Sequence, residues 1–131
     1  GTGGTICGAG RYLKELKPDI KLIAIEPSES PFISQGIFTP HRMMGTAPGF
    51  IPDTLDKELI DEIFLVSERD AFSACRELAT KEGILVGITS GAVTHASRLV
   101  AARDEFAGDT LVCILPDTGQ RYLSVEGLFQ D

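Results

Sequence analysis

The first five residues of the chain, Gly1, Thr2, Gly3, Gly4 and Thr5, combine three glycines with two threonines directly before a predicted helix. Glycines allow consecutive backbone N–H groups to converge on an anion, and threonine hydroxyls add further donors. The positive end of the helix dipole favours negative charge at the same place. Without a basic residue in the segment, such a nest suits a single phosphate monoester. A flexible terminus or an ordinary turn is the alternative interpretation.

Two better-known phosphate motifs do not fit this segment. A dinucleotide fingerprint GxGxxG fails, because Ile6 or Leu13 stands where the third glycine belongs. A P-loop fails as well, because the sequence contains no Gly-Lys-Ser or Gly-Lys-Thr. The motif that remains is the nest for one phosphate.

A second group of hydroxyl residues lies in the segment EGILVGITSGAVTHA, residues 82–96. Gly87, Thr89, Ser90 and Gly91 interrupt two apolar stretches at the point where a helix is predicted to begin. Hydroxyls held between a buried turn and a helix start are able to face a ligand. The alternative is that Thr89 or Ser90 caps the helix.

A third group, Asp117, Thr118 and Gly119, follows the last apolar run in LPDTGQRYLS, residues 115–124. Open α/β sheets bind ligands at the carboxyl ends of their strands, so this position favours a ligand site. The alternative is a plain turn, because Pro-Asp-Thr-Gly is good turn chemistry.

The elements that must position these groups alternate along the chain. Short apolar runs rich in Ile, Leu and Val predict buried strands over residues 21–26, 62–67 and 110–116. Helical periodicity predicts helices over residues 8–17, 68–82 and 91–105. Ser67 and Asp70 resemble a capping box, and Gly83 suits a helix end. Strands separated by helices predict an α/β fold, an open parallel sheet with flanking helices.

Helix periodicity also predicts the buried faces. The expected inward residues are Ala9, Tyr12, Leu13 and Leu16 in the first helix, Ala71, Ala74, Cys75 and Leu78 in the second, and Ala92, Ala96, Leu99 and Val100 in the third. His95 is expected to be a partly exposed structural residue.

Composition excludes several kinds of partner. The length of 131 residues with 43% hydrophobic content suits one domain, and a net charge of -7 without a dense basic cluster argues against nucleic acid. No apolar run approaches the roughly 20 residues that span a bilayer, so no membrane contact is expected. The cysteines Cys7, Cys75 and Cys113 lack metal-ligand spacing, so we expect packing residues in a reducing compartment and no metal site.

Five segments in series resemble the C-terminal half of the cysteine synthase (O-acetylserine sulfhydrylase) family, pyridoxal-phosphate enzymes of fold type II. They are GTGGTICGAGRYLK at 1–14, IAIEPSESP at 23–31, GTAPGFIPDTLD at 45–56, EGILVGITSGA at 82–92 and LPDTGQRYLS at 115–124. The resemblance implies that residues 1–131 are the C-terminal, cofactor-binding portion, part of the large domain of such an enzyme. It also implies that a strand and the rest of the enzyme precede Gly1.

The resemblance assigns roles to residues of this sequence. Gly1 to Thr5 would bind the 5′-phosphate of pyridoxal 5′-phosphate, and Thr89 stands where the family usually has a serine that hydrogen-bonds the pyridine nitrogen. Gly45 would lie on the substrate side, although MMGTAPGF differs from the family's common IQGIGAGF. PDTGQRY replaces the PSSGERY of many members.

The implied reaction is β-replacement of O-acetyl-L-serine with sulfide, which gives L-cysteine and acetate. A neutral hydroxyl at the pyridine nitrogen does not hold that nitrogen protonated as a carboxylate would, so prompt loss of a β-leaving group is favoured. The Schiff-base lysine of the family lies upstream, and none of the five lysines falls in a matching motif. We therefore expect no catalytic residue in this segment and no activity from these residues alone.

Further expectations follow from the resemblance. The intact protein is expected to be a cytoplasmic homodimer. The C-terminal tail of serine acetyltransferase is expected to contact His41, which lies beside Arg42 in the Pro-rich loop. The alternatives are a related β-replacement enzyme, cystathionine β-synthase or an O-phosphoserine sulfhydrylase, and a non-enzymatic phosphate-binding module.

Overall fold

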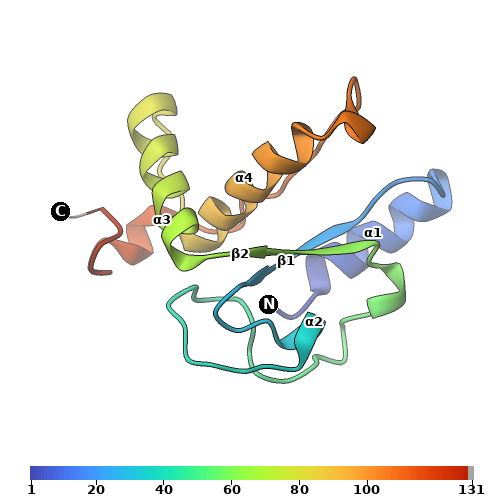
Figure 1. Cartoon of the computed structure of the whole chain (residues 1–131), viewed down its shortest axis with the longest axis horizontal. Helices are drawn as coiled ribbons and strands as arrows, with labels where there is room; N and C mark the ends of the chain where they lie inside the picture. The colour runs from blue at the N-terminus through green and yellow to red at the C-terminus, as the bar shows by residue number, and fades with distance from the viewer. Residues whose placement is uncertain (130–131) are drawn as a thin grey trace.

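The computed structural model describes residues 1–129 and contains a pair of strands with helices on either side (Figure 1). The helices and strands are, in chain order, α1 (Gly4–Leu16), β1 (Ile23–Pro27), α2 (Phe32–Gln35), β2 (Glu62–Val66), α3 (Glu68–Glu77) and α4 (Ile88–Ala101). Short 3-10 turns span Lys57–Leu59, Asp104–Phe106 and Gly119–Tyr122, and a π-helical turn spans Leu78–Glu82. Figure 1 places α3 and α4 on one side of the strands and the long loop of residues 36–56 on the other.

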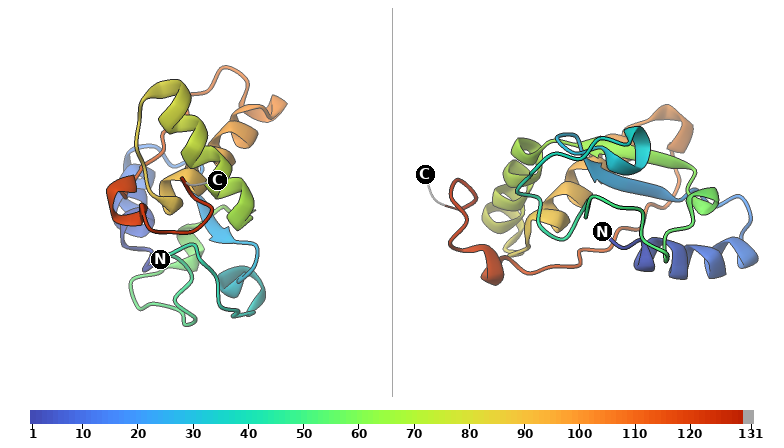
Figure 2. Two further views of the ribbon diagram at one scale, coloured as in Figure 1. Left: turned by 90° about the vertical axis from the view of Figure 1, so that its left-hand side faces the viewer. Right: turned by 90° about the horizontal axis from the view of Figure 1, so that it is seen from below.

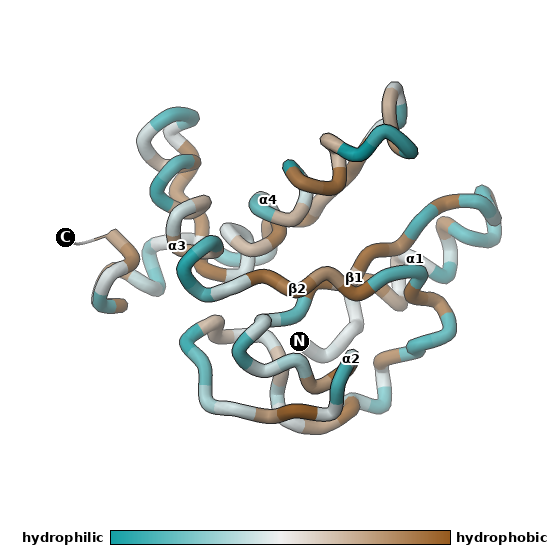
Figure 3. Tube along the Cα trace, viewed as in Figure 1, coloured by the Kyte–Doolittle hydropathy of each residue, from teal (hydrophilic) through white to brown (hydrophobic). Residues whose placement is uncertain are grey.

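The first two predicted strands are confirmed. β1 and β2 pair in parallel, with Ile23 opposite Glu62 and Pro27 opposite Val66. Both strands are hydrophobic along most of their length (Figure 3). Parallel pairing requires a long crossover, and residues 28–61 between the two strands supply it.

The prediction of a third strand over residues 110–116 is wrong. In the described residues this run joins no sheet, and residues 111–116 are exposed, with Val112 at 80%. Figure 2 shows it as an extended trace that leads from the end of α4 toward the C-terminal segment. Its composition suits a strand, but a strand also needs a neighbour to accept and donate backbone hydrogen bonds. Neither β1 nor β2 is that neighbour.

The second predicted helix is confirmed as α3 and its π-helical extension. The Ser67 hydroxyl accepts a hydrogen bond from the Asp70 amide at 3.1 Å and caps the N-terminus, and Gly83 ends the helix at φ 69°. All four residues predicted to face inward are buried: Ala71, Ala74, Cys75 and Leu78.

Replacing Ser67 with alanine should therefore lower the free energy of unfolding by about 1 kcal/mol, because the Asp70 amide loses its acceptor. Urea unfolding followed by circular dichroism measures the change. Ser67→Thr is the matched control, since threonine keeps the hydroxyl that accepts from the Asp70 amide and donates to the Asp70 carboxylate, and it should retain most of the stability. An alanine variant as stable as the parent would contradict this assignment of the cap.

The other two predicted helices are present, but their buried faces are partly different. α4 buries Ala92, Ala96 and Val100 as predicted, while Leu99 is 49% exposed. The stripe predicted for α1 is wrong, because Ala9, Tyr12, Leu13 and Leu16 are all exposed. α1 instead buries Cys7 and Gly10. Periodicity locates an apolar stripe, but only tertiary contacts decide whether a neighbour covers it.

The core lies where α3 crosses α4. A Cβ on Gly91 would overlap the Ala71 carbonyl oxygen and the Cys75 sulfur, so the two helices approach closely at a position that only glycine permits. The Cys75 thiol donates to the Gly87 carbonyl at 3.1 Å, and burial raises the pKa of this thiol to about 11. Cys75 and Cys7 are buried packing residues as predicted, whereas Cys113 is exposed.

Candidate functional site

The glycine-rich segment leads directly into α1. Gly1, Thr2 and Gly3 precede the helix, while Gly4 and Thr5 already belong to its first turn, four residues earlier than the predicted start at residue 8. Gly3 is left-handed at φ 79°, and no side chain caps the helix. The Gly4 amide has only a long contact of 3.3 Å to the Thr2 hydroxyl. The N–H groups of the first turn have no partner within the helix. They lie in a mostly exposed segment.

The loop of residues 36–56 holds this segment in place. The Thr54 hydroxyl donates to the Thr2 carbonyl at 2.5 Å, and the Asp56 amide donates to the Cys7 sulfur at 3.2 Å. A Cβ on Gly3 would lie 2.6 Å from Cδ1 and 3.1 Å from Cα of Leu55. The conformation of the segment therefore depends both on glycine at position 3 and on the loop behind it.

Gly45 lies between the glycine-rich segment and Thr89. A Cβ on Gly1 would overlap the Gly45 carbonyl oxygen. A Cβ on Gly45 itself would lie 3.6 Å from Oγ1 of Thr89, and its φ is 88°. The structure thus brings together three parts of the chain that sequence analysis singled out separately.

Thr89 lies in the first turn of α4 and faces the same loop. Its hydroxyl donates to the Met44 carbonyl at 3.0 Å. Within the loop, the Thr46 hydroxyl donates to the Met43 carbonyl at 2.6 Å, and the Met43 side chain is fully buried. These contacts hold the Met44–Gly45 backbone against the start of α4.

Neither Thr89 nor Ser90 caps α4 with its own side chain. The N-cap position is Gly87, and the carboxylate of Asp117 accepts from the Thr89 amide at 3.2 Å and from the Ser90 amide at 2.9 Å. The capping alternative raised for Thr89 and Ser90 is therefore wrong. Asp117 is more than a turn residue, because it joins the segment after residue 116 to the first turn of α4.

The arrangement suits a ligand with an anion at one end and a ring nitrogen at the other. The open N–H groups of the α1 first turn offer donors to a phosphate. The Thr89 hydroxyl, on the far side of Gly45, offers acceptor lone pairs, and it would have to release the Met44 carbonyl before its single proton could be donated to a ligand. A side chain at position 1 or 3 would occupy the space that the loop now fills. The residues present therefore fit a phosphorylated pyridine.

Within residues 1–129, no lysine forms a hydrogen bond or ion pair with the glycine-rich segment, Gly45 or Thr89. Lys14 pairs with Asp61, Lys17 with Asp19 and Lys81 with Glu77, and Lys57 donates to the Ile33 carbonyl. None of these partners belongs to the glycine-rich segment, Gly45 or Thr89. The candidate site thus contains groups that bind and orient, and no lysine amine.

Comparison with known proteins decides between a phosphate-binding module and an enzyme. The family model described as "Pyridoxal-phosphate dependent enzyme" matches residues 1–117. The chain belongs to this pyridoxal-phosphate-dependent family. The probable cysteine synthase of Bacillus subtilis is 47% identical over 126 residues, which cover 96% of this chain and 40% of that protein. The chain therefore spans about 40% of the length of this relative.

Solved structures of the family show the same fold. A cysteine synthase from Entamoeba histolytica superposes with a TM-score of 0.93 at 42% identity, covering 95% of this chain and 37% of that one. An O-ureido-L-serine synthase superposes with a TM-score of 0.90 at 38% identity, covering 96% and 40%. Membership establishes the fold type II architecture and pyridoxal phosphate as the cofactor of the family.

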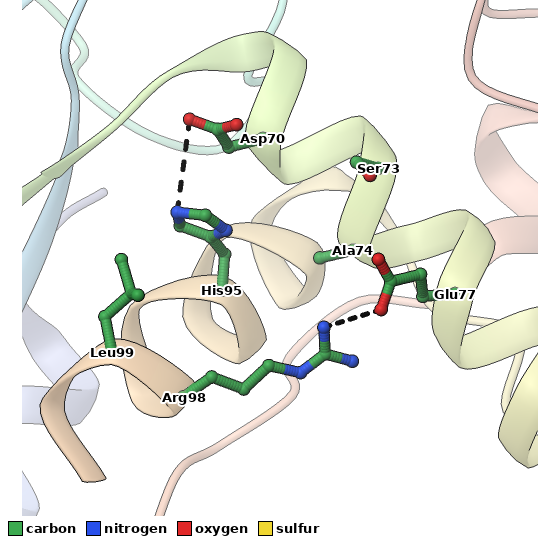
Figure 4. A pocket seen from close by; sticks show the side chains of 7 residues that line it. All are labelled: Asp70, Ser73, Ala74, Glu77, His95, Arg98 and Leu99. Carbon is green, nitrogen blue, oxygen red and sulfur yellow. Dashed lines mark hydrogen bonds and ion pairs between the residues drawn. The ribbon is translucent and has the colours of Figure 1, made fainter. Parts of the chain in front are cut away.

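A depression of about 310 Å³ between α3 and α4 lies outside the candidate site. Figure 4 shows His95 directed toward Asp70, with nitrogen and oxygen 4.0 Å apart, and Arg98 paired with Glu77 at 2.7 Å. The His95 side chain is 29% exposed, which confirms its prediction as a partly exposed structural residue. Residues 1–129 contain no group of His, Cys, Asp and Glu suited to a metal ion.

His41 and Arg42 contribute to the folding of the long loop. His41 Nε2 lies 3.3 Å from the Ala47 carbonyl, and its ring is half-buried. Arg42 pairs with Glu68 at the start of α3, and its guanidinium lies 4.9 Å from the centre of the Phe72 ring. Both residues thus help to hold the loop that carries Gly45.

The sequence did not indicate the Met44 carbonyl, and it indicated Asp117 only as part of a candidate ligand site or a turn, not as the cap of α4. The Asp117 carboxylate contacts residues 27 and 28 positions away, a separation that no local pattern encodes. The Met44 carbonyl is a backbone group, so its pairing with Thr89 leaves no trace in residue type. The acidic residue after the apolar run 110–116 was the only available signal.

Among residues 1–129, none of the helices has the length and apolar character that a membrane-spanning helix needs.

Proposed function

We propose that residues 1–131 form the C-terminal, cofactor-binding part of a cysteine synthase, which replaces the acetoxy group on the β-carbon of O-acetyl-L-serine with sulfide to give L-cysteine and acetate. The observation that carries the proposal is the proximity of Gly1, Gly45 and Thr89, which stand far apart in the sequence. The names of the relatives support the choice of cysteine synthase within the family.

In this proposal, Gly1, Thr2, Gly3, Gly4 and Thr5 hold the 5′-phosphate of the cofactor. The donors are backbone N–H groups of the α1 first turn, and the helix dipole adds positive potential there. The phosphate needs no lysine or arginine in the segment, because the N–H groups and the dipole supply the positive charge.

Thr89 accordingly holds the pyridine nitrogen through its hydroxyl. The bound cofactor supplies an electron-withdrawing ring. The neutral Thr89 hydroxyl would leave that withdrawal weaker than a carboxylate would, which would suit substrates with a good leaving group on the β-carbon. The Met44 carbonyl, which now accepts from Thr89, lies beside the ring site.

Gly45 forms the substrate side of the site. It is exposed, and its φ of 88° leaves a backbone surface without a side chain at the point nearest Thr89. A small amino acid substrate is able to approach such a surface closely. The similarity to an O-ureido-L-serine synthase and to an O-acetylserine dependent cystathionine β-synthase keeps a different second substrate as an alternative. An O-phosphoserine sulfhydrylase, with a different first substrate, is the other alternative.

The decisive experiment is an assay of the full-length natural protein that contains this chain. Purified protein with pyridoxal phosphate, O-acetyl-L-serine and sulfide should release cysteine and acetate in equal amounts. Parallel reactions with homocysteine or with O-phospho-L-serine separate the alternatives. Faster cysteine formation from O-phospho-L-serine than from O-acetyl-L-serine would overturn the proposal in favour of an O-phosphoserine sulfhydrylase. Product formation with homocysteine but not with sulfide would overturn it in favour of cystathionine β-synthase.

The 131-residue chain by itself should form no cysteine from O-acetyl-L-serine and sulfide. The physical reason is that the site described above contains no lysine to bond the cofactor or remove the Cα proton. The measurement is the same assay, together with the absorbance of a lysine-bound cofactor. Turnover by the isolated chain, with that absorbance, would show that one of the five lysines acts after all.

We further infer a cytoplasmic homodimer whose active-site mouth receives the C-terminal tail of serine acetyltransferase near His41. The support is the resemblance to the family and the position of His41 in the loop that carries Gly45. Titration of the full-length protein with a peptide that ends in isoleucine tests the contact. The expected result is saturable binding that a His41→Ala substitution weakens severalfold, and unchanged binding would remove His41 from the contact.

A further inference from the structure

Asp117 makes an unusually complete set of contacts with the start of α4. Its carboxylate accepts from the Thr89 and Ser90 amides at 3.2 and 2.9 Å and also from the Ser90 hydroxyl. Its backbone takes part as well, because the Asp117 carbonyl accepts from the Gly87 amide at 3.1 Å. The Ser90 hydroxyl lies within 3.3 Å of the Asp117 amide.

The Asp117 carboxylate packs directly against Gly87. A Cβ on Gly87 would overlap the Asp117 carboxylate and lie 2.5 Å from Cε2 of Tyr122. Ser90 is fully buried, so its hydroxyl depends on Asp117 for its partners. One packed unit is thus formed by Gly87, Ser90 and Asp117. In this unit the Asp117 carboxylate caps the N-terminus of α4, where Gly87 has no side chain to do so.

This unit determines where the Thr89 hydroxyl lies. The Thr89 amide is one of the two that the carboxylate binds, and the Oγ1 atom of the same residue is directed to the Met44 carbonyl at 3.0 Å. A carboxylate at the positive end of a helix forms strong, charge-assisted hydrogen bonds. Loss of the charge would loosen the first turn of α4 and let the Thr89 side chain turn away.

We propose that Asp117 is the positioning residue for Thr89: through the first turn of α4 it aims the Thr89 hydroxyl at the pyridine nitrogen of the cofactor. The proposal rests on the proposed function of Thr89. Asp117 does not itself touch the cofactor in this scheme, so its whole effect on cofactor binding passes through the Thr89 hydroxyl.

A double-mutant cycle in the full-length natural protein tests this route. Asp117→Asn keeps the shape but removes the charge, and Thr89→Val keeps the shape but removes the hydroxyl. Asp117→Asn should raise the dissociation constant of pyridoxal phosphate about tenfold, the effect of one hydrogen bond to a charged group. When Thr89→Val is already present, adding Asp117→Asn should change the constant by less than about twofold. The absorption spectrum of the bound cofactor should shift alike in both single variants.

Two further variants keep the result interpretable. Asp117→Ser, which shortens the side chain and removes the charge, replaces Asp117→Asn if the latter does not fold. Ser67→Ala removes the cap of α3 in the same way but should leave the cofactor affinity and spectrum unchanged. The proposal is overturned if Asp117→Asn raises the dissociation constant of pyridoxal phosphate by the same factor with and without the Thr89→Val substitution. It is also overturned if Asp117→Asn leaves this constant unchanged in both cases. Absence of cofactor binding by the unsubstituted protein would instead overturn the proposed function beneath it.

Discussion

Gly3→Ala in the full-length natural protein should raise the dissociation constant of pyridoxal phosphate about 100-fold. Gly3 has a φ of 79°, and an added Cβ would lie 2.6 Å from the Leu55 side chain and 3.1 Å from its Cα. The left-handed conformation and the overlap together correspond to about 3 kcal/mol. Moving the segment away from Leu55 relieves this strain, but the first N–H groups of α1 then no longer converge on one phosphate. Fluorescence titration of the apoenzyme measures the affinity.

Gly83→Ala is the matched control for this substitution. Gly83 has a similar φ of 69°, but a Cβ there would meet no atom within 4 Å. This variant should lose about 1 kcal/mol of stability from the left-handed conformation and keep the cofactor affinity of the parent. If Gly3→Ala binds pyridoxal phosphate as tightly as Gly83→Ala does, the glycine-rich segment is not the phosphate site.

Gly91→Ala should have the largest effect on stability, a loss of about 3 kcal/mol in the free energy of unfolding. The added Cβ would overlap the Ala71 carbonyl oxygen and the Cys75 sulfur where α3 and α4 cross. One of the two overlapping groups is backbone, so the helices must separate, and the buried Ala71, Cys75 and Ile88 would lose contacts. Urea unfolding monitored by circular dichroism gives the value.

Gly8→Ala provides the comparison within a helix. Gly8 lies in α1, and a Cβ there would meet no atom within 4 Å. Alanine is the better helix former, so this variant should be more stable by up to about 1 kcal/mol. A Gly91→Ala variant that shows the same gain would mean that α3 and α4 do not pack at this glycine.

The fold illustrates which features are local. The N-cap at Ser67 and the helix end at Gly83 were predicted correctly, because each depends on residues within one or two turns. The buried face of α3 was also predicted correctly, because α4 covers the apolar stripe that periodicity located. The exposed stripe of α1 and the unpaired run at 110–116 were not. Their apolar composition resembles that of buried elements, and burial requires a neighbouring element whose position no local pattern specifies.

The candidate site divides in the same way. The sequence by itself determined the glycine-rich segment and Thr89 as chemically distinctive residues, and the resemblance to the family added Gly45. Only the tertiary structure decided that Gly1 packs on Gly45, that Thr89 donates to Met44, and that Asp117 caps α4. These contacts join residues 27 to 45 positions apart, and chain folding alone brings them within hydrogen-bond distance.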